Sequence, residues 1–235
     1  MIKFDIISIF PSVFDRYFNV SILNRAQKKK LIKIKIHNLR DWTVDKRKTV
    51  DERPYGGGPG MIMMAEPIFK AVKTITKSIL KPKTKIILFS PKGKKFDQKM
   101  AKKLSRLDGL IMICGRYEGV DERVAEKLAD EEISIGDYIL TGGEIPAMIV
   151  VDVVTRLIPG VIAKESLEEE SFSLKQEKNF RNENYEYPQY TRPEKLVIRD
   201  KNNRVKKITV PKILLSGNHK KIKEWRKNHI TRLNQ

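Results

Sequence analysis

Five short apolar segments stand out in the first 160 residues. The segment 2–10 is apolar on both faces, as a central strand would be, whereas 31–37 alternates strictly and places Ile32, Ile34 and Ile36 on one side. Runs of 4–8 such residues are typical of strands. The pattern predicts strands at 2–10, 31–37, 85–90, 110–114 and 133–135.

Between these segments, apolar residues recur at helical spacing. The pattern predicts helices at 66–80, 96–107 and 144–160. The third is apolar nearly all round, broken only by Asp152, Thr155 and Arg156, so we expect it to be buried in the core or in a subunit interface. Strands that alternate with helices indicate an α/β fold with a mainly parallel sheet.

The chain changes character after residue 163. Residues 164–191 are acidic and then polar, which is typical of a linker, and 192–235 form a small basic module. Asn218 is expected to cap a helix with Ile222, Trp225 and Leu233 on one side, Trp225 being a core residue rather than a base-stacking platform. We therefore predict a domain at 1–163, a flexible linker at 164–191 and a mostly helical domain at 192–235.

The charge is strongly positive. The chain has 48 Lys and Arg against 29 Asp and Glu, a net charge of +19, which points to nucleic acid or an anionic membrane surface. Surface lysines are also usual on solvated faces, so charge alone does not identify the partner. No apolar run reaches the roughly 18 residues that span a bilayer, and the N-terminus carries an acid within its apolar stretch. We expect a cytoplasmic protein.

Cysteine and histidine give little sign of a metal site. The single Cys114 ends an apolar run, so we expect a buried thiol rather than a nucleophile. The three histidines share no metal-ligand spacing, which argues against zinc.

Three glycine-bearing loops each follow a predicted strand: "FSPKG", "GRYEG" and "GDYILTGGE". Neither a phosphate-binding P-loop nor GxGxxG is present, because Leu88 and Lys95 occupy positions that a P-loop gives to Gly and Ser or Thr. Ligands of open α/β sheets bind outside the carboxyl ends of strands, and glycine lets main chain approach them. Each loop alone is typical of a turn, but together they predict a pocket for a small, mostly apolar ligand.

Six motifs, in order, resemble those of the bacterial tRNA (guanine-N1)-methyltransferases: "YGGGPGM", "CGRYEGVDERV", "SIGDYILTGGEIPAM", "RLIPGV", "YTRPE" and "SGNHKKIKEWR". The resemblance covers nearly the whole chain. It implies a homodimer of the SPOUT superfamily, with a deep trefoil knot that the general rule on connections would not predict. It also implies that S-adenosylmethionine donates a methyl group to guanosine 37, beside the anticodon.

The resemblance assigns residues of the three loops to the methyl donor. They are Ser90, Pro91, Gly115, Tyr117, Glu118, Gly119, Ile135, Gly136, Asp137, Tyr138, Ile139, Leu140, Gly142, Gly143 and Pro146.

For catalysis, the resemblance implies that a carboxylate removes the proton from guanine N1. It also implies that Arg156 stabilises the negative charge that develops on guanine O6. That carboxylate is Glu170, with Glu169 as the alternative, where relatives usually have aspartate. Without the resemblance, Arg156 would be interpreted as a charge that complements a helix dipole, and the triple-Glu run as a solvated face.

The resemblance also predicts contacts with tRNA, from Arg53, Gly58, Gly60, Glu186, Lys220 and Arg226. Relatives have aspartate at the position of Glu186, and residues 51–61 could instead be an ordinary surface loop. The expected partners are tRNA with guanosine 37 and a second copy of the chain, not DNA or a membrane. We expect no metal held by the protein, while assistance by Mg²⁺ stays open.

Two other interpretations are open. One is a SPOUT methyltransferase of ribosomal RNA, which "GRYEGVDER" and the "YTRPE" module disfavour. The other is an RNA-binding protein with an idle donor pocket, which only the two Asp-to-Glu changes favour.

Overall fold

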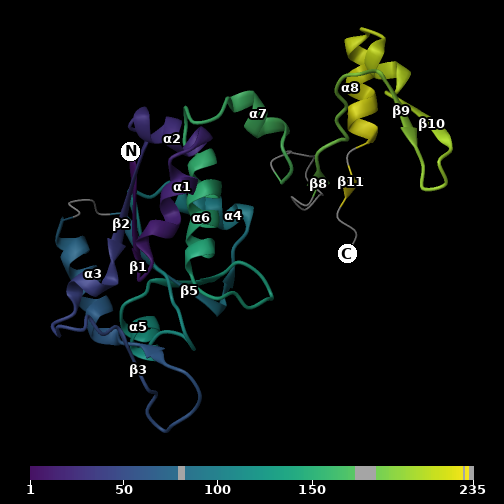
Figure 1. Cartoon of the computed structure of the whole chain (residues 1–235). Helices are drawn as coiled ribbons and strands as arrows, with labels where there is room; N and C mark the ends of the chain where they lie inside the picture. The colour runs from purple at the N-terminus through teal and green to yellow at the C-terminus, as the bar shows by residue number, and fades with distance from the viewer. Residues whose placement is uncertain (79–82, 173–183, 230, 233–235) are drawn as a thin grey trace. The chain divides into compact units, whose positions relative to one another are not determined.

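A five-stranded parallel sheet organises the N-terminal part of the chain, in the order β2-β1-β6-β5-β7 (Figure 1). The computed structural model describes residues 1–78, 83–172, 184–229 and 231–232. The sheet strands are β1 (Ile2–Ser8), β2 (Ile32–Asn38), β5 (Thr84–Lys95), β6 (Gly109–Ile113) and β7 (Glu131–Ser134). The predicted mainly parallel α/β architecture is therefore confirmed, whereas a trefoil knot stays a prediction.

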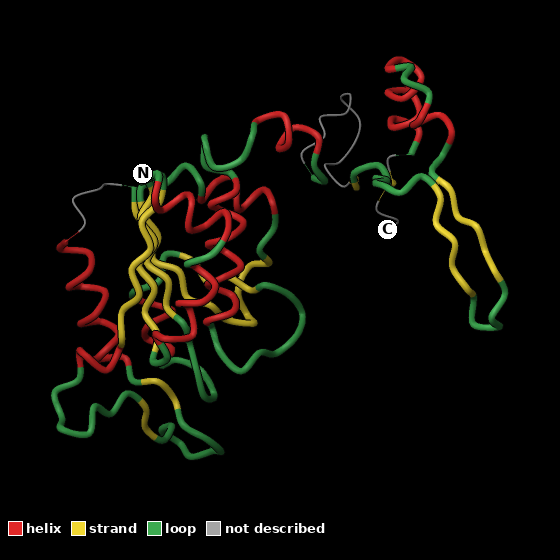
Figure 2. The backbone as a smooth tube through the Cα atoms, turned by 45° about the horizontal axis from the view of Figure 1, so that its top comes forward, coloured by secondary structure: helices red, strands yellow, loops and turns green. Residues whose placement is uncertain are grey.

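The chain divides into two compact units, Met1–Ala163 and Lys164–Gln235, each of which is described by itself. In the first unit, helices cover both faces of the sheet (Figure 2). One face packs against α1 (Asp15–Phe18), α2 (Ser21–Lys28), α4 (Gln98–Leu104) and α6 (Glu144–Arg156). The other packs against η2 (Leu39–Trp42), α3 (Ala65–Ser78) and α5 (Glu122–Lys127).

Two hydrophobic cores result, one on each face of the sheet. Successive residues of β1 enter opposite cores, Ile6 with α6 and Ile7 with α3. Side chains alternate between the faces of a strand, so a strand covered on both sides must be apolar throughout. This explains why the start of the chain is apolar on both faces.

Asp5 interrupts that run and is fully buried in β1. Its Oδ1 lies 2.8 Å from His37 Nε2 on β2, and its Oδ2 lies 3.1 Å from Lys3 Nζ. A buried carboxylate needs such partners, because removal from water is costly.

We expect Asp5→Ala to lower the free energy of unfolding by about 2 kcal/mol, because it leaves His37 without its carboxylate partner in the interior. Urea denaturation measures the change. Glu66→Ala is the control, since Glu66 forms an exposed ion pair with Lys70 and should cost about 0.5 kcal/mol at most. Equal losses in the two variants would contradict this account of the buried cluster.

Several short elements were not predicted from the pattern of apolar residues in the sequence. They are η1 (Pro11–Phe14), α1, α2, α5 and a small antiparallel ribbon of β3 (Asp51–Glu52) and β4 (Ile62–Met63). Pieces of eight residues or fewer are too short for a helical period to identify them with certainty. α1 is positioned by packing, with the rings of Phe14 and Phe18 stacked at 5.5 Å.

β5 is longer than expected, because it continues past Pro91. Phe89 and Lys94 both pair with Ile133 of β7, so residues 90–93 bulge out of the strand between them. A bulge is one of the places where proline is tolerated in a sheet. α6 in turn ends at Arg156, earlier than the predicted residue 160.

The C-terminal unit holds more strand than expected. It contains α7 (Lys164–Glu169), β8 (Asn184–Tyr185), β9 (Lys195–Arg199), β10 (Val205–Thr209), η3 (Lys212–Leu215), α8 (His219–Asn228) and β11 (Thr231–Arg232). The hairpin β9–β10 corrects the expectation of a mostly helical module, because its strands interleave charged and aliphatic residues around the turn at 200–204. Asn218 caps α8 as predicted, accepting a hydrogen bond from Lys221 N at 3.1 Å. The helix ends at Asn228. Leu233, which was expected on the same side of this helix, lies outside the described residues.

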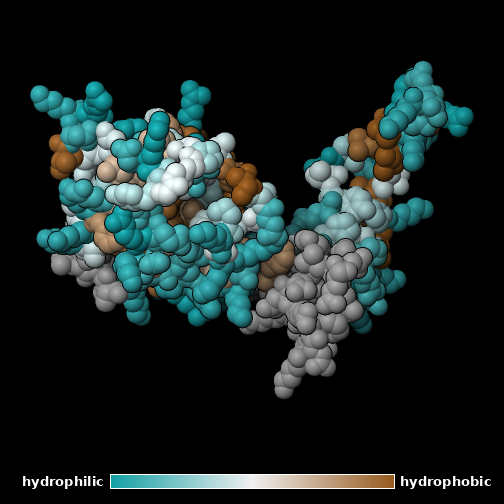
Figure 3. Space-filling view, turned by 90° about the horizontal axis from the view of Figure 1, so that it is seen from below, coloured by the Kyte–Doolittle hydropathy of each residue, from teal (hydrophilic) through white to brown (hydrophobic). Residues whose placement is uncertain are grey.

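The described part of the chain contains no helix that is both long enough and apolar enough to cross a membrane. On the face shown in Figure 3, most of the described residues are hydrophilic, with separate hydrophobic patches among them.

Candidate functional site

A cavity of about 590 Å³ lies in the first unit, where β5, β6 and β7 give way to the three glycine-bearing loops. The bulge at 90–93, the 115–119 loop and the 135–143 loop form most of its wall, and we call it the donor cavity. Its volume falls within the range of about 300–1,000 Å³ that is usual for small-ligand sites.

The structure brings fourteen of the fifteen expected donor residues to this cavity. Those that line it are Ser90, Pro91, Gly115, Tyr117, Glu118, Gly119, Ile135, Gly136, Tyr138, Ile139, Leu140, Gly142, Gly143 and Pro146. The exception is Asp137, which is exposed and lies 2.6 Å from Lys95 Nζ. The grouping does not by itself test what these residues bind.

Gly143 shows why the 135–143 loop needs glycine. A Cβ at this position would lie 2.6 Å from Cys114 Cα and 2.9 Å from Gly115 N, both of which are backbone atoms. Gly143 N also donates a hydrogen bond to Gly115 O at 2.8 Å. Two stretches of main chain therefore lie in direct contact here, which only a residue without a side chain permits.

Three carboxylates line the donor cavity, from Glu118, Glu122 and Glu132. Glu122 lies 3.0 Å from Lys92 Nζ, and this carboxylate raises the pKa of Lys92. Much of the remaining wall is aliphatic, from residues such as Leu88, Ile133 and Leu140. The basic residues Lys92 and Arg116 also line the cavity. Such a lining suits a ligand that is partly apolar and carries charge of both signs.

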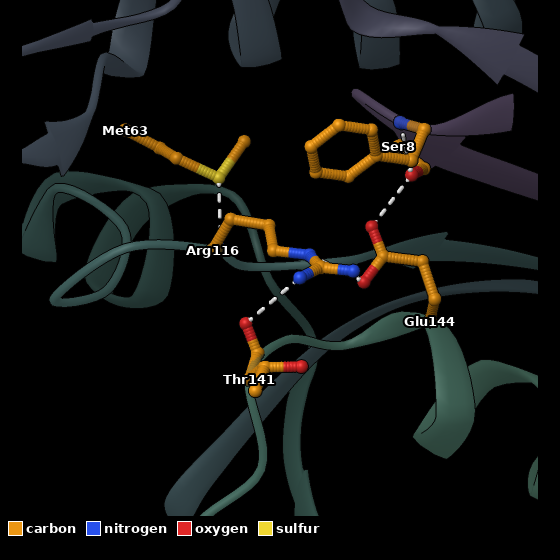
Figure 4. A network of polar contacts seen from close by, with 6 residues as sticks. Ser8, Met63, Arg116, Thr141 and Glu144 are labelled. Atoms are coloured by element: carbon orange, nitrogen blue, oxygen red, sulfur yellow. Dashed lines mark hydrogen bonds and ion pairs between the residues drawn. The ribbon is translucent and has the colours of Figure 1, made fainter.

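An ion pair behind the loops was missed by the sequence analysis. Arg116 Nε donates to Glu144 Oε2 at 2.9 Å, and Arg116 Nη1 donates to the Thr141 carbonyl at 3.1 Å (Figure 4). Ser8 Oγ donates to the other carboxylate oxygen of Glu144 at 2.7 Å. The sequence did contain a sign of this ion pair. Glu144 is a single acid at the start of an apolar helix and Arg116 is a single arginine in a glycine-bearing loop, and both charges need partners if they are buried.

The expected catalytic residues belong to different compact units. Arg156 is the last residue of α6 in the first unit, and it is half-buried. Glu170 follows α7 in the second unit and is also half-buried. Glu169 is the last residue of α7, and its side chain lies outside the described part of the structure. Their relation to one another stays a prediction.

Glu170 and Glu186 are the two positions of the predicted substrate loop where relatives have aspartate, and a hydrogen bond joins the segments that contain them. Glu186 N donates a hydrogen bond to Ser171 Oγ at 3.0 Å, directly after Glu170. The residues between them, 173–183, lie outside the described residues.

The 51–61 segment lies beside the donor cavity. Glu118 N donates to the Met61 carbonyl at 3.0 Å, and a Cβ on Gly60 would lie 2.5 Å from Glu118 Cγ. Arg53 and Gly58 are exposed in the same segment. The placement is compatible with the predicted role of this segment in substrate contact.

The expected tRNA contacts of α8 are exposed. Lys220 and Arg226 both lie on the solvent side, and the Arg226 guanidinium is 4.8 Å from the centre of the Tyr187 ring. Trp225 is half-buried and stacks on His229 with ring centres 4.0 Å apart, as a packing residue of this unit would.

The remaining chemistry of the described residues is sparse. They contain no group of three or more His, Cys, Asp or Glu side chains that could hold a metal ion. Cys114 is fully buried, and burial raises the pKa of its thiol well above the usual value.

Comparison with known proteins identifies relatives of the whole chain. Residues 2–235 match the family model described as tRNA (Guanine-1)-methyltransferase TrmD. A tRNA (guanine-N(1)-)-methyltransferase of Dictyoglomus turgidum is 53% identical over 97% of this chain and 84% of its own length. A protein of the same name from Thermomicrobium roseum is 51% identical over 96% of this chain and 77% of its own length. Another, from Clostridioides difficile, is 45% identical over 98% of this chain and 93% of its own length. The chain therefore belongs to the tRNA (guanine-N1)-methyltransferase family.

Proposed function

We propose that this protein transfers the methyl group of S-adenosylmethionine to N1 of guanosine 37 in tRNA. The observation that carries the proposal is the gathering of three glycine-bearing loops around one cavity, in a chain that matches its family from end to end. Because tRNA is the proposed substrate, we place the reaction in the cytoplasm.

The donor cavity fits S-adenosylmethionine in size and lining. The aliphatic wall and the glycine-bearing main chain of the 115–119 and 135–143 loops suit an adenosine, while the acidic residues Glu118, Glu122 and Glu132 suit a cationic sulfonium. When bound, this donor supplies a methyl group on a leaving group that needs no activation by the protein.

The task of the side chains is then to make guanine N1 nucleophilic. We assign Glu170, or Glu169 beside it, to accept the N1 proton, and Arg156 to donate hydrogen bonds to O6 as negative charge develops there. Arginine suits this role because its guanidinium stays charged and presents a planar set of donors.

A homodimer would explain apolar side chains that the first unit leaves exposed. Ile139 and Ile145 are 79% and 52% exposed, although they stand beside the donor cavity and at the start of an otherwise buried helix. We propose that a second copy of the chain covers them, and that the basic helix α8 holds tRNA through phosphate contacts.

The proposal predicts a specific product. Incubation with labelled S-adenosylmethionine and unmodified tRNA carrying guanosine at positions 36 and 37 should yield 1-methylguanosine at position 37, detected by mass spectrometry of the digested RNA. The same tRNA with adenosine at position 37 is the control and should take up no label. Binding of tRNA without transfer would favour the alternative of an RNA-binding protein with an idle pocket.

A further inference from the structure

We propose that Arg116 and Glu144 are positioning residues, which fix the shape of the donor cavity by holding the 135–143 loop against the 115–119 loop. The inference rests on the proposed use of the cavity for S-adenosylmethionine. It concerns Glu144, which does not line the cavity, and Arg116, which lines it but which no assignment of donor contacts includes.

Glu144 is a charge that the fold encloses almost completely. It is 2% exposed, and both of its carboxylate oxygens accept hydrogen bonds, one from Ser8 Oγ and one from Arg116 Nε. It is also the first residue of α6, where the helix dipole favours negative charge. Glu144 is therefore fixed from three directions, by the end of β1, by the 115–119 loop and by its own helix.

Arg116 belongs to the 115–119 loop, and its side chain connects the Glu144 carboxylate to the 135–143 loop. Its guanidinium donates to the Thr141 carbonyl, and it lies 4.7 Å from the centre of the Phe10 ring. Its own backbone N–H donates to Met63 Sδ at 3.1 Å. In Figure 4 the guanidinium lies between Glu144 and Thr141, so one planar group joins the start of α6 to the loop that precedes it.

Gly142 shows how closely the loop follows this side chain. A Cβ at Gly142 would lie 2.3 Å from Arg116 Nε and 2.7 Å from Glu144 Oε2, so the loop backbone rests directly on the ion pair. Gly142 and Thr141 both line the donor cavity, as does Arg116. A shift of the ion pair must therefore move the cavity wall.

A buried ion pair is weak evidence for stability, because the cost of desolvation offsets much of the attraction. What this pair provides is geometry, since the fork of arginine makes two hydrogen bonds at fixed angles and the single ammonium of lysine cannot. A role in stability and a role in positioning make different predictions, because only the positioning role requires that loss of the ion pair weaken donor binding.

The test is the affinity for S-adenosylmethionine, without tRNA, measured by isothermal titration calorimetry alongside the thermal unfolding midpoint. Arg116→Lys and Glu144→Gln should each weaken binding by about tenfold. The double variant should lose about as much as either single one, because both changes break the same interaction.

Glu131→Gln is the matched control. Glu131 is also a half-buried, ion-paired carboxylate, 3.1 Å from Lys85 Nζ, but it does not line the donor cavity. It should lower the unfolding midpoint without changing donor affinity. Should the buried pair be needed for folding, Ser8→Ala keeps the ion pair and removes the hydrogen bond to Glu144 together with the one that Ser8 Oγ accepts from Phe10 N. This variant should still weaken binding by a few-fold.

Folded variants of Arg116, Glu144 and Ser8 that bind the donor as the parent does, and lose only thermal stability, would overturn the inference. A parent protein that binds no donor at all would instead overturn the proposed function, so the two failures are distinguishable.

Discussion

Glu170→Gln is expected to slow methyl transfer by about 10²- to 10⁴-fold, the usual contribution of a general base. Glutamine keeps the shape of the side chain but cannot accept the N1 proton of guanosine. The measurement is the single-turnover rate of 1-methylguanosine formation with saturating tRNA and donor. Affinity for S-adenosylmethionine should not change, because the donor cavity lies in the other compact unit of the chain.

Glu169→Gln is the matched variant, since it makes the same change one residue earlier. It should transfer methyl groups at the parent rate if Glu170 is the base. A large loss in Glu169→Gln with full activity in Glu170→Gln would move the role to Glu169, and full activity in both would reject a glutamate base at this position.

Gly143→Ala is expected to weaken donor binding by about a hundredfold, because the loop must move by about an ångström to make room for one methyl group. The atoms in its way are Cys114 Cα and Gly115 N, neither of which can rotate aside as a side chain would. Titration of S-adenosylmethionine into the folded variant measures the loss.

Gly115→Ala provides the comparison within the same wall. Its Cβ would lie 3.1 Å from Val120 Cγ2, a side chain that can yield, and 3.8 Å from Phe89 O, an ordinary van der Waals contact. The loss of affinity should therefore be clearly smaller than in Gly143→Ala. Similar losses in both variants would show that space beside the ligand, rather than contact between the two backbones, makes glycine necessary.

Much of the first unit follows from local pattern. The apolar runs at β1 and β6 are confirmed as strands that are buried on both sides, and Asn218 caps its helix through the expected side-chain bond. Such features depend on neighbours in the sequence, so the sequence alone predicts them. The gathering of glycine loops at one edge also follows, because a parallel sheet brings the ends of its strands together.

Other features depend on partners far away in the chain. β5 continues beyond Pro91 only because β7 pairs with it a second time. Arg116 and Glu144 stand 28 positions apart, and no period relates them. The hairpin β9–β10 was missed because exposed strands that mix lysine with aliphatic residues show no clean alternation. The relation of Arg156 to Glu170 stays a prediction because it involves both compact units.

The strand order also constrains how the protein can be made. β1 and β5 leave the ribosome early but never pair with each other, since β6, which is synthesised after both, fills the place between them. Assembly of the sheet therefore waits for residue 113, and such non-local pairing is slow. Completion of the donor cavity waits longer, for the first turn of α6. A nascent chain should consequently acquire affinity for the methyl donor only near the end of this unit, which makes the ligand a reporter of late co-translational folding.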